Sequence, residues 1–144
     1  MTIRLPAVIM QAVRRETAME EHSILIADKD TNYLSEISEY FKGAGYAVAT
    51  TDSAVHVICD ILKKNVPVLL LGSDFDKKIG LPQLLHLLKK CNRHLAVILV
   101  SDEESLPMVR RIRGEGIFYH ALRPVTQDDR EEIKQAIECA FKAS

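Results

Sequence analysis

Residues 66–76 read VPVLLLGSDFD, a dense aliphatic run that stops at Gly72. The consecutive aliphatic residues Val68–Leu71 are typical of a strand that is buried on both faces, as in a parallel sheet covered by helices. The acidic residues Asp74 and Asp76 follow only after the glycine. We therefore expect a central parallel strand that ends in a glycine and is followed by a solvated acidic loop.

The alternation of apolar runs and helical periodicity continues along the chain from residue 23 to residue 142. The apolar runs predict strands at 23–27, 46–50, 68–71, 95–100 and 117–121. The segment after each run carries apolar residues at three- and four-residue spacing, which predicts a helix. This order indicates an α/β fold: a flavodoxin-like, receiver-type (βα)5 domain with a doubly wound, five-stranded parallel sheet of order 2-1-3-4-5. In such a sheet the functional site lies beyond the carboxyl ends of the strands.

Composition excludes several classes of function. Lys and Arg total 19 and Asp and Glu total 20, a net charge of −1, so nucleic acid is not an expected partner. The three cysteines lack metal-site spacing and indicate a reducing, cytoplasmic compartment. No apolar run reaches the roughly 18 residues of a membrane span. We expect residues 1–21 to be an N-terminal extension, either disordered or helical, and residues 22–144 to form the domain.

Polar or small residues mark the points where the predicted strands end. Asp28 follows the first strand, Gly72 ends the third, Ser101 follows the fourth, and Arg123 and Pro124 follow the fifth. With these residues in place, the chain from 23 to 142 resembles the receiver domain of bacterial two-component response regulators. The resemblance implies acids that hold Mg²⁺, an aspartate ending strand three that accepts a phosphoryl group, and a hydroxyl and a lysine that bind the phosphoryl oxygens.

The sequence departs from the family pattern at the acidic positions. Lys29 stands where a second acid is expected, and Asp30 follows one place late. In the family a glycine follows the acceptor by eight residues, so counting back from Gly80 puts Gly72 at the acceptor position. Glycine offers no nucleophile, and Mg²⁺ requires several hard oxygen ligands. We expect Lys29 to pair with Asp28 or Asp30 in the place of the metal.

The expected pseudo-active site consists of Asp28, Lys29, Asp30, Gly72, Ser101, Arg123 and Pro124. The preferred interpretation is a stand-alone receiver-like signalling module in a two-component or phosphorelay context. It would be no enzyme, would need no cofactor and would act by phosphorylation-independent protein binding. One alternative is an active response regulator that uses Asp74 or Asp76 as acceptor with Mg²⁺, with Asp28 and Asp30 as weak metal ligands. Another alternative is a flavodoxin-like domain that binds a small ligand.

The resemblance also implies a partner-binding face, which the family forms from its fourth helix, fifth strand and fifth helix. In this sequence that face contains Met108, Arg111, Ile112 and His120. The expected partner is a protein such as a histidine kinase or another response regulator, and a homodimer through the same face is an alternative. His120 aligns with the aromatic residue usual on strand five, and its imidazole is interpreted either as a pH-dependent switch or as a surface side chain.

Overall fold

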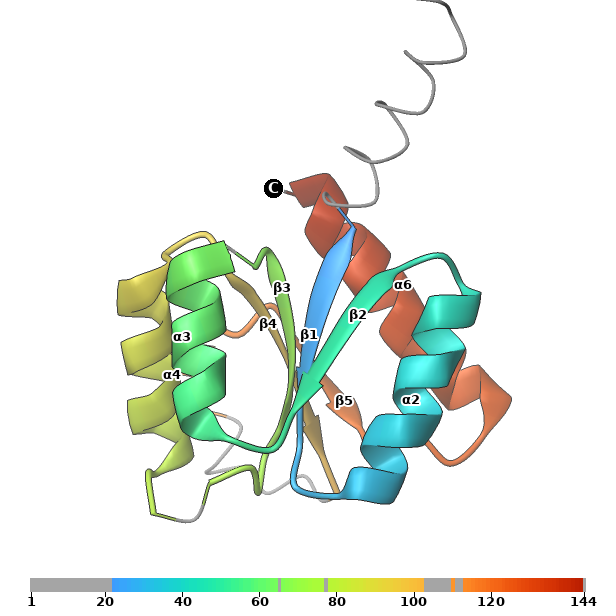
Figure 1. Ribbon diagram of the computed structural model, residues 1–144, viewed down its shortest axis with the longest axis horizontal. Coiled ribbons are helices and arrows are strands. Elements are labelled where there is room, and N and C mark those ends of the chain that lie inside the picture. Colours follow the sequence, from blue (N-terminus) through green and yellow to red (C-terminus); the bar gives the residue numbers. More distant parts are fainter. Residues whose placement is uncertain (1–21, 65, 77, 103–109, 111–112, 144) are drawn as a thin grey trace, which may run out of the picture.

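Five parallel strands form a single sheet in the order β2-β1-β3-β4-β5 (Figure 1). The computed structural model describes residues 22–143 except 65, 77, 103–109 and 111–112. The strands are β1 Ser23–Ala27, β2 Ala47–Thr51, β3 Val68–Gly72, β4 Ala96–Ser101 and β5 Tyr119–Leu122. The expected doubly wound parallel sheet of order 2-1-3-4-5 is confirmed.

Within the described part of the chain, four helices cover the two faces of the sheet. They are α2 Thr31–Gly43, α3 Ala54–Lys64, α4 Leu81–Cys91 and α6 Gln127–Ala143. Figure 1 shows α3 and α4 on one face of the sheet and α2 and α6 on the other. The helix expected just before the fifth strand falls largely outside the described residues. None of the described helices is long and apolar enough to cross a membrane.

The side chains of β3 alternate between two hydrophobic cores, one on each face of the sheet. Leu69 and Leu71 pack with α3 and α4, whereas Val68 and Leu70 pack with α2 and α6. All four side chains are fully buried, because β3 lies in the middle of the sheet between β1 and β4. Burial of both faces accounts for the unbroken aliphatic run, and the predicted central strand is confirmed.

The fifth strand begins later than its apolar pattern predicted. The expected range was 117–121, whereas β5 runs from Tyr119 to Leu122. Ile117 packs against the core under α3 and α4 before the strand begins, and Gly116 turns the chain there with a φ of 82°. Ile117 and Phe118 were therefore read as part of the strand, whereas they lie between the turn at Gly116 and the start of β5. The observed register places Arg123 directly at the strand end.

The loop after β3 is anchored to the core by an aromatic side chain. Phe75 is only 2% exposed and packs with the residues under α3 and α4, and its N–H donates to the Gly72 carbonyl at 3.1 Å. Its neighbour Asp74 is exposed, as expected for a solvated loop. The loop thus exposes Asp74 to solvent and buries Phe75 in the core. The sequence pattern predicted the exposed acid but not the buried aromatic side chain.

We predict that Phe75→Ala lowers the free energy of unfolding by about 3–5 kcal/mol, because it leaves a cavity in a closely packed core. The matched control is Asp74→Ala in the same loop, which should change stability by no more than about 0.5 kcal/mol because the side chain is exposed. Urea unfolding followed by circular dichroism measures both values. Equal stabilities of the two variants would show that Phe75 does not anchor the loop.

Candidate functional site

The ends of four neighbouring strands bring the expected site residues together at one edge of the sheet. Backbone hydrogen bonds continue just past the strands, since the N–H of Asp28 donates to Thr51 and the N–H of Arg123 donates to Ser101. Asp28 and Ser101 are buried, with exposed fractions of 4% and 3%. The loops that follow the strands are therefore held in register, and their side chains face a common site.

The carboxylate of Asp28 occupies the space that a side chain at residue 72 would need. A Cβ placed on Gly72 would lie 2.3 Å from Oδ2 and 2.9 Å from Cγ of Asp28, far inside van der Waals contact. Gly72 is not among the glycines that have a positive φ, so its backbone conformation does not require glycine. The space taken by Asp28 is what requires it.

Two contacts hold the Asp28 carboxylate in that position. Oδ1 accepts the N–H of Asp30 at 3.0 Å, and Oδ2 lies 3.4 Å from Nη2 of Arg123. Arg123 is itself held from the other side, because its Nε donates to Oδ1 of Asp102 at 2.7 Å. Burial opposes the charge of Arg123, but the hydrogen bond to Asp102 and the Asp28 carboxylate together raise the pKa of the guanidinium. The result is a carboxylate–guanidinium–carboxylate chain across the ends of β1, β5 and β4.

Tyr33, in the first turn of α2, packs its ring against the Arg123 guanidinium. The Cζ atom of Arg123 lies 4.7 Å from the centroid of the Tyr33 ring, which is a cation–π contact. Burial and, secondarily, the Asp28 carboxylate raise the pKa of the Tyr33 phenol well above its ordinary value. The Tyr33 hydroxyl and Nη1 of Arg123 are buried, and neither has a hydrogen-bond partner among the described residues.

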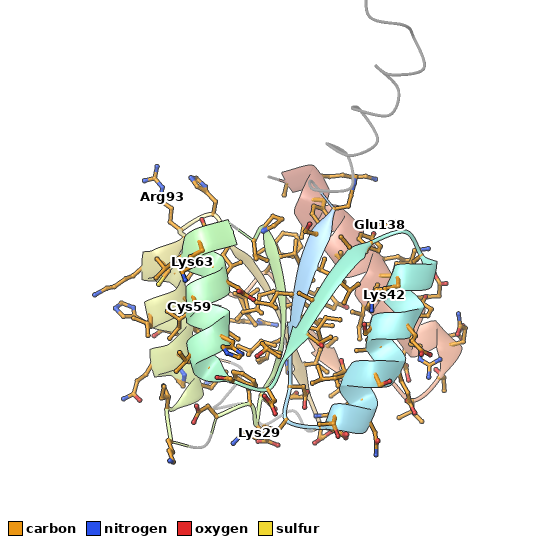
Figure 2. All side chains as sticks on the ribbon, in the orientation of Figure 1. Lys29, Lys42, Cys59, Lys63, Arg93 and Glu138 are labelled. Atoms are coloured by element: carbon orange, nitrogen blue, oxygen red, sulfur yellow. The ribbon has the colours of Figure 1, made fainter. Side chains whose placement is uncertain are left out.

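Lys29 does not take the role that the sequence suggested for it. The side chain is exposed, and Figure 2 shows it at the outer edge of the site. The expected pairing with Asp28 or Asp30 is not formed: Arg123 contacts Asp28, and Oδ1 of Asp30 accepts the Tyr33 N–H at 3.1 Å as the N-cap of α2. The residue after a strand end points away from its predecessor, which explains why the adjacent lysine does not contact Asp28.

The alternative acceptors lie in the loop beyond β3. Asp74 is exposed, and Asp76 uses Oδ1 to accept the N–H groups of Lys78 and Ile79 at 2.9 and 3.3 Å. These backbone hydrogen bonds lower the pKa of the Asp76 carboxyl. The Asp76 carboxylate therefore binds backbone N–H groups of its own loop. The residue at the strand end itself is Gly72, which has no carboxylate.

The donor set does not fit a Mg²⁺ ion. Mg²⁺ requires near-octahedral oxygen ligands at about 2.0–2.1 Å. Here Gly72 supplies no side-chain oxygen, Lys29 carries an ammonium, and the Asp28 carboxylate is in contact with a guanidinium. The described residues contain no group of three or more acidic, histidine or cysteine side chains that could hold a metal ion.

A hydrogen bond links the site to the strand on which the partner-binding face was expected. Oγ of Ser101 lies 2.6 Å from Nε2 of His120, and His120 is half-buried on β5. The structure thus brings together Asp28, Gly72, Ser101 and Arg123 as expected and adds His120 to them. Met108, Arg111 and Ile112, the other expected residues of that face, lie outside the described residues.

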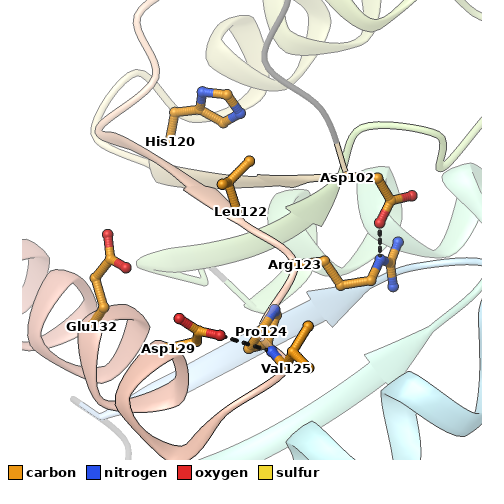
Figure 3. A pocket seen from close by; sticks show the side chains of 8 residues that line it. All are labelled: Asp102, His120, Leu122, Arg123, Pro124, Val125, Asp129 and Glu132. Atoms are coloured by element: carbon orange, nitrogen blue, oxygen red, sulfur yellow. Dashed lines mark hydrogen bonds and ion pairs between the residues drawn. The ribbon is translucent and has the colours of Figure 1, made fainter.

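A surface pocket of about 540 Å³ opens beside this hydrogen bond (Figure 3). Its walls come from the end of β4, from β5 and from the first turns of α6. The lining residues are Asp102, His120, Leu122, Arg123, Pro124, Val125, Asp129 and Glu132. We call the cluster of Asp28, Gly72, Ser101 and Arg123 the closed site. Arg123 therefore belongs to both the closed site and the pocket. Sequence reasoning missed Asp102 and Tyr33, although Asp102 directly follows the expected hydroxyl residue and its position at a strand end was a usable signal.

Solved structures with a similar fold include receiver domains. A response regulator receiver domain from Clostridium thermocellum superposes with a TM-score of 0.72 at 22% identity, over 84% of this chain and 94% of that one. A CheY-like receiver domain from Methanospirillum hungatei JF-1 gives 0.73 at 23%, over 85% and 98%. The chemotaxis protein CheY4 from Vibrio cholerae gives 0.71 at 13%, over 80% and 97%. At these identities the likeness shows the receiver fold. No protein-family model matches the sequence, and no curated protein matches it significantly.

We predict that Gly72→Ala destabilises the protein by about 1–3 kcal/mol, because the new methyl group overlaps the Asp28 carboxylate. Without that overlap the same change would stabilise the protein by about 0.4–1 kcal/mol, because alanine lowers the conformational entropy of the unfolded chain. In an Asp28→Ala background, Gly72→Ala should accordingly be neutral or stabilising. Urea unfolding of the four proteins gives the coupling energy. Equal effects of Gly72→Ala in both backgrounds would contradict the proposed overlap.

Tyr33 should make the protein sensitive to alkali. An unfolded tyrosine releases its proton near pH 10, whereas buried Tyr33 retains it, so the free energy of unfolding should fall as the pH rises above about 10. Tyr33→Phe should flatten this decline and leave stability at pH 7 unchanged or higher, because the hydroxyl has no partner among the described residues. Unfolding measured from pH 7 to 11 tests this expectation, and identical slopes for both proteins would refute it.

Proposed function

We propose that the protein is a receiver-like signalling module that acts in a two-component or phosphorelay context by binding a protein partner without phosphorylation. The carrying observation is the contact of Asp28 with Gly72 and Arg123. The carboxylate that would hold a metal lies instead in the space of the missing acceptor side chain, and a guanidinium neutralises it. This geometry supports a scaffold that performs no phosphotransfer and no other catalysis.

The closed site would hold the partner-binding face in one state. Arg123 contacts Asp28 and Asp102 and also lines the pocket, and Ser101 contacts His120 on the same wall. Those contacts join the protein's own side chains, and we infer that they would position the pocket walls without a phosphoryl group. We infer that a partner, such as a histidine kinase or another response regulator, recognises this face directly.

The alternative is an active response regulator with an acceptor displaced into the loop after β3. Asp74 is the more available candidate, because it is exposed, whereas the Asp76 carboxylate accepts two backbone hydrogen bonds. Such an acceptor would need Mg²⁺, and the neighbouring Asp28 carboxylate would have to leave Arg123. Dependence on Mg²⁺ therefore separates the two functions.

The test is an amide NMR titration with Mg²⁺ followed by beryllofluoride, a mimic of a bound phosphoryl group. We expect no saturable shifts at Asp28, Gly72 and Ser101, because the Asp28 carboxylate is already paired with Arg123. The matched control is the Lys29→Asp, Gly72→Asp variant, which restores the family's acids and displaces the Asp28 carboxylate. This variant should show Mg²⁺-dependent shifts at the same residues.

Saturable shifts in the unmodified protein, spreading to His120 and Arg123, would overturn the proposal and favour a displaced acceptor. In that case Asp74→Asn should abolish the response to beryllofluoride. Asp76→Asn should abolish it instead if Asp76 is the acceptor.

A further inference from the structure

The large apolar side chains that are exposed in the described part of the chain fall into two patches. The basic apolar patch lies on the outer faces of α3 and α4 and contains Val55, Leu62 and Leu87. The acidic apolar patch lies at β5 and the start of α6 and contains Phe118, Tyr119, Leu122 and Val125. Two separate groups, with no such residue elsewhere in the described ranges, indicate two places where apolar surface meets something other than the protein's own core.

The apolar residues of the basic apolar patch are not needed by the core. The inward face of α3 is already supplied by Val57 and Ile61, both fully buried. Val55 and Leu62 lie on the outward side, two turns apart, with exposed fractions of 66% and 60%. Cys59 lies between them on the same stripe, and Figure 2 shows it on the outer side of α3.

Basic residues lie at the C-terminal ends of the two helices that carry this patch. The last turns hold Lys63 on α3 and Lys90 on α4, and the Lys89 ammonium donates to the Leu95 carbonyl; Asp60 is the one acid in the two helical sequences. Figure 2 shows Lys63 on α3 and Arg93 just beyond α4 on the same side of the molecule. The net charge of −1 for the whole chain therefore conceals a basic region at this end of α3 and α4.

The acidic apolar patch carries more acidic than basic side chains. Leu122 and Val125 are 51% and 83% exposed and line the pocket. The acids Asp102, Asp129 and Glu132 line it as well, together with Arg123, whose guanidinium is paired with Asp102 and Asp28. Asp128 lies one turn before Glu132 on the same face of α6, so the acidic surface extends beyond the pocket. Apolar surface with an acidic border thus faces outward at this edge of the sheet.

We propose that a second copy of this chain docks head to tail, with the basic apolar patch of one copy against the acidic apolar patch of the next. The patches differ in sign of charge and both expose apolar side chains, so each is the complementary surface for the other. They lie on different elements of the fold, which makes the contact heterologous: it closes into a ring or extends into a filament. This inference goes beyond the proposed function and does not depend on it.

The test is self-association of the full chain, measured by sedimentation velocity over a range of protein concentrations. The unmodified protein should associate at low salt, and association should weaken as salt shortens the Debye length from roughly 30 Å at 0.01 M to 3 Å at 1 M. Lys63→Glu with Lys90→Glu should abolish association, and so should Asp128→Lys with Glu132→Lys. An equimolar mixture of these two variants should associate again, because the inverted patches complement each other.

The matched control for the Asp128→Lys, Glu132→Lys variant is Glu36→Lys with Glu39→Lys, which makes the same charge change on exposed positions of α2, outside both patches. This variant should associate like the unmodified protein, and circular dichroism should show that every variant is folded. A monomeric unmodified protein at all concentrations would overturn the proposal. Association that survives the Lys63→Glu, Lys90→Glu change would also overturn it, because a two-fold dimer through β5 would survive that change. A mixture of the two variants that stays monomeric would overturn it as well.

Discussion

The position of the Asp28 carboxylate above Gly72 constrains the whole carboxyl edge of the sheet. The carboxylate fills the volume of the absent side chain, and the glycine in turn leaves room for it. Residues 28 and 72 end neighbouring strands, so their proximity is fixed by the pairing of β1 with β3. A substitution at either residue therefore alters the packing of the other.

The contacts of Asp28 extend this constraint to three other elements. Asp30 donates its N–H to Asp28 and begins α2, while Arg123 brings in the end of β5 and Asp102 the end of β4. Taking a carboxylate out of water is costly unless hydrogen bonds and an opposite charge compensate it. Here both kinds of compensation come from protein groups. The Asp28 carboxylate is therefore compensated inside the protein, by the Asp30 N–H and the Arg123 guanidinium.

Much of this arrangement could be predicted from the sequence because it follows from strand order. Continuous aliphatic runs indicated a covered parallel sheet, and parallel strands bring Asp28, Gly72 and Ser101 to one edge. The partner of Asp28 could not be predicted in the same way, because it depends on the direction of each side chain. Adjacent Lys29 points to solvent, whereas Arg123, distant in sequence, makes the contact.

Other features depend on packing that no local pattern reveals. Phe75 is part of an acidic loop in the sequence but belongs to the core in three dimensions, because the loop turns back onto the sheet. The contact of Ser101 with His120 requires the register of β4 against β5, which no local pattern gives, and the apolar pattern around Ile117 misplaced the start of β5. Charge shows the same limit, since the balanced total hides opposite signs on the two exposed apolar patches.

The most direct test of the closed site is a crystal structure of the protein grown in the presence of Mg²⁺. We predict that the Asp28 carboxylate lies directly over Gly72 and within hydrogen-bonding distance of the Arg123 guanidinium, as it does without the ion. A Mg²⁺ ion ligated by Asp28, with Arg123 turned away from it, would contradict the view that the protein has exchanged its metal site for an internal ion pair.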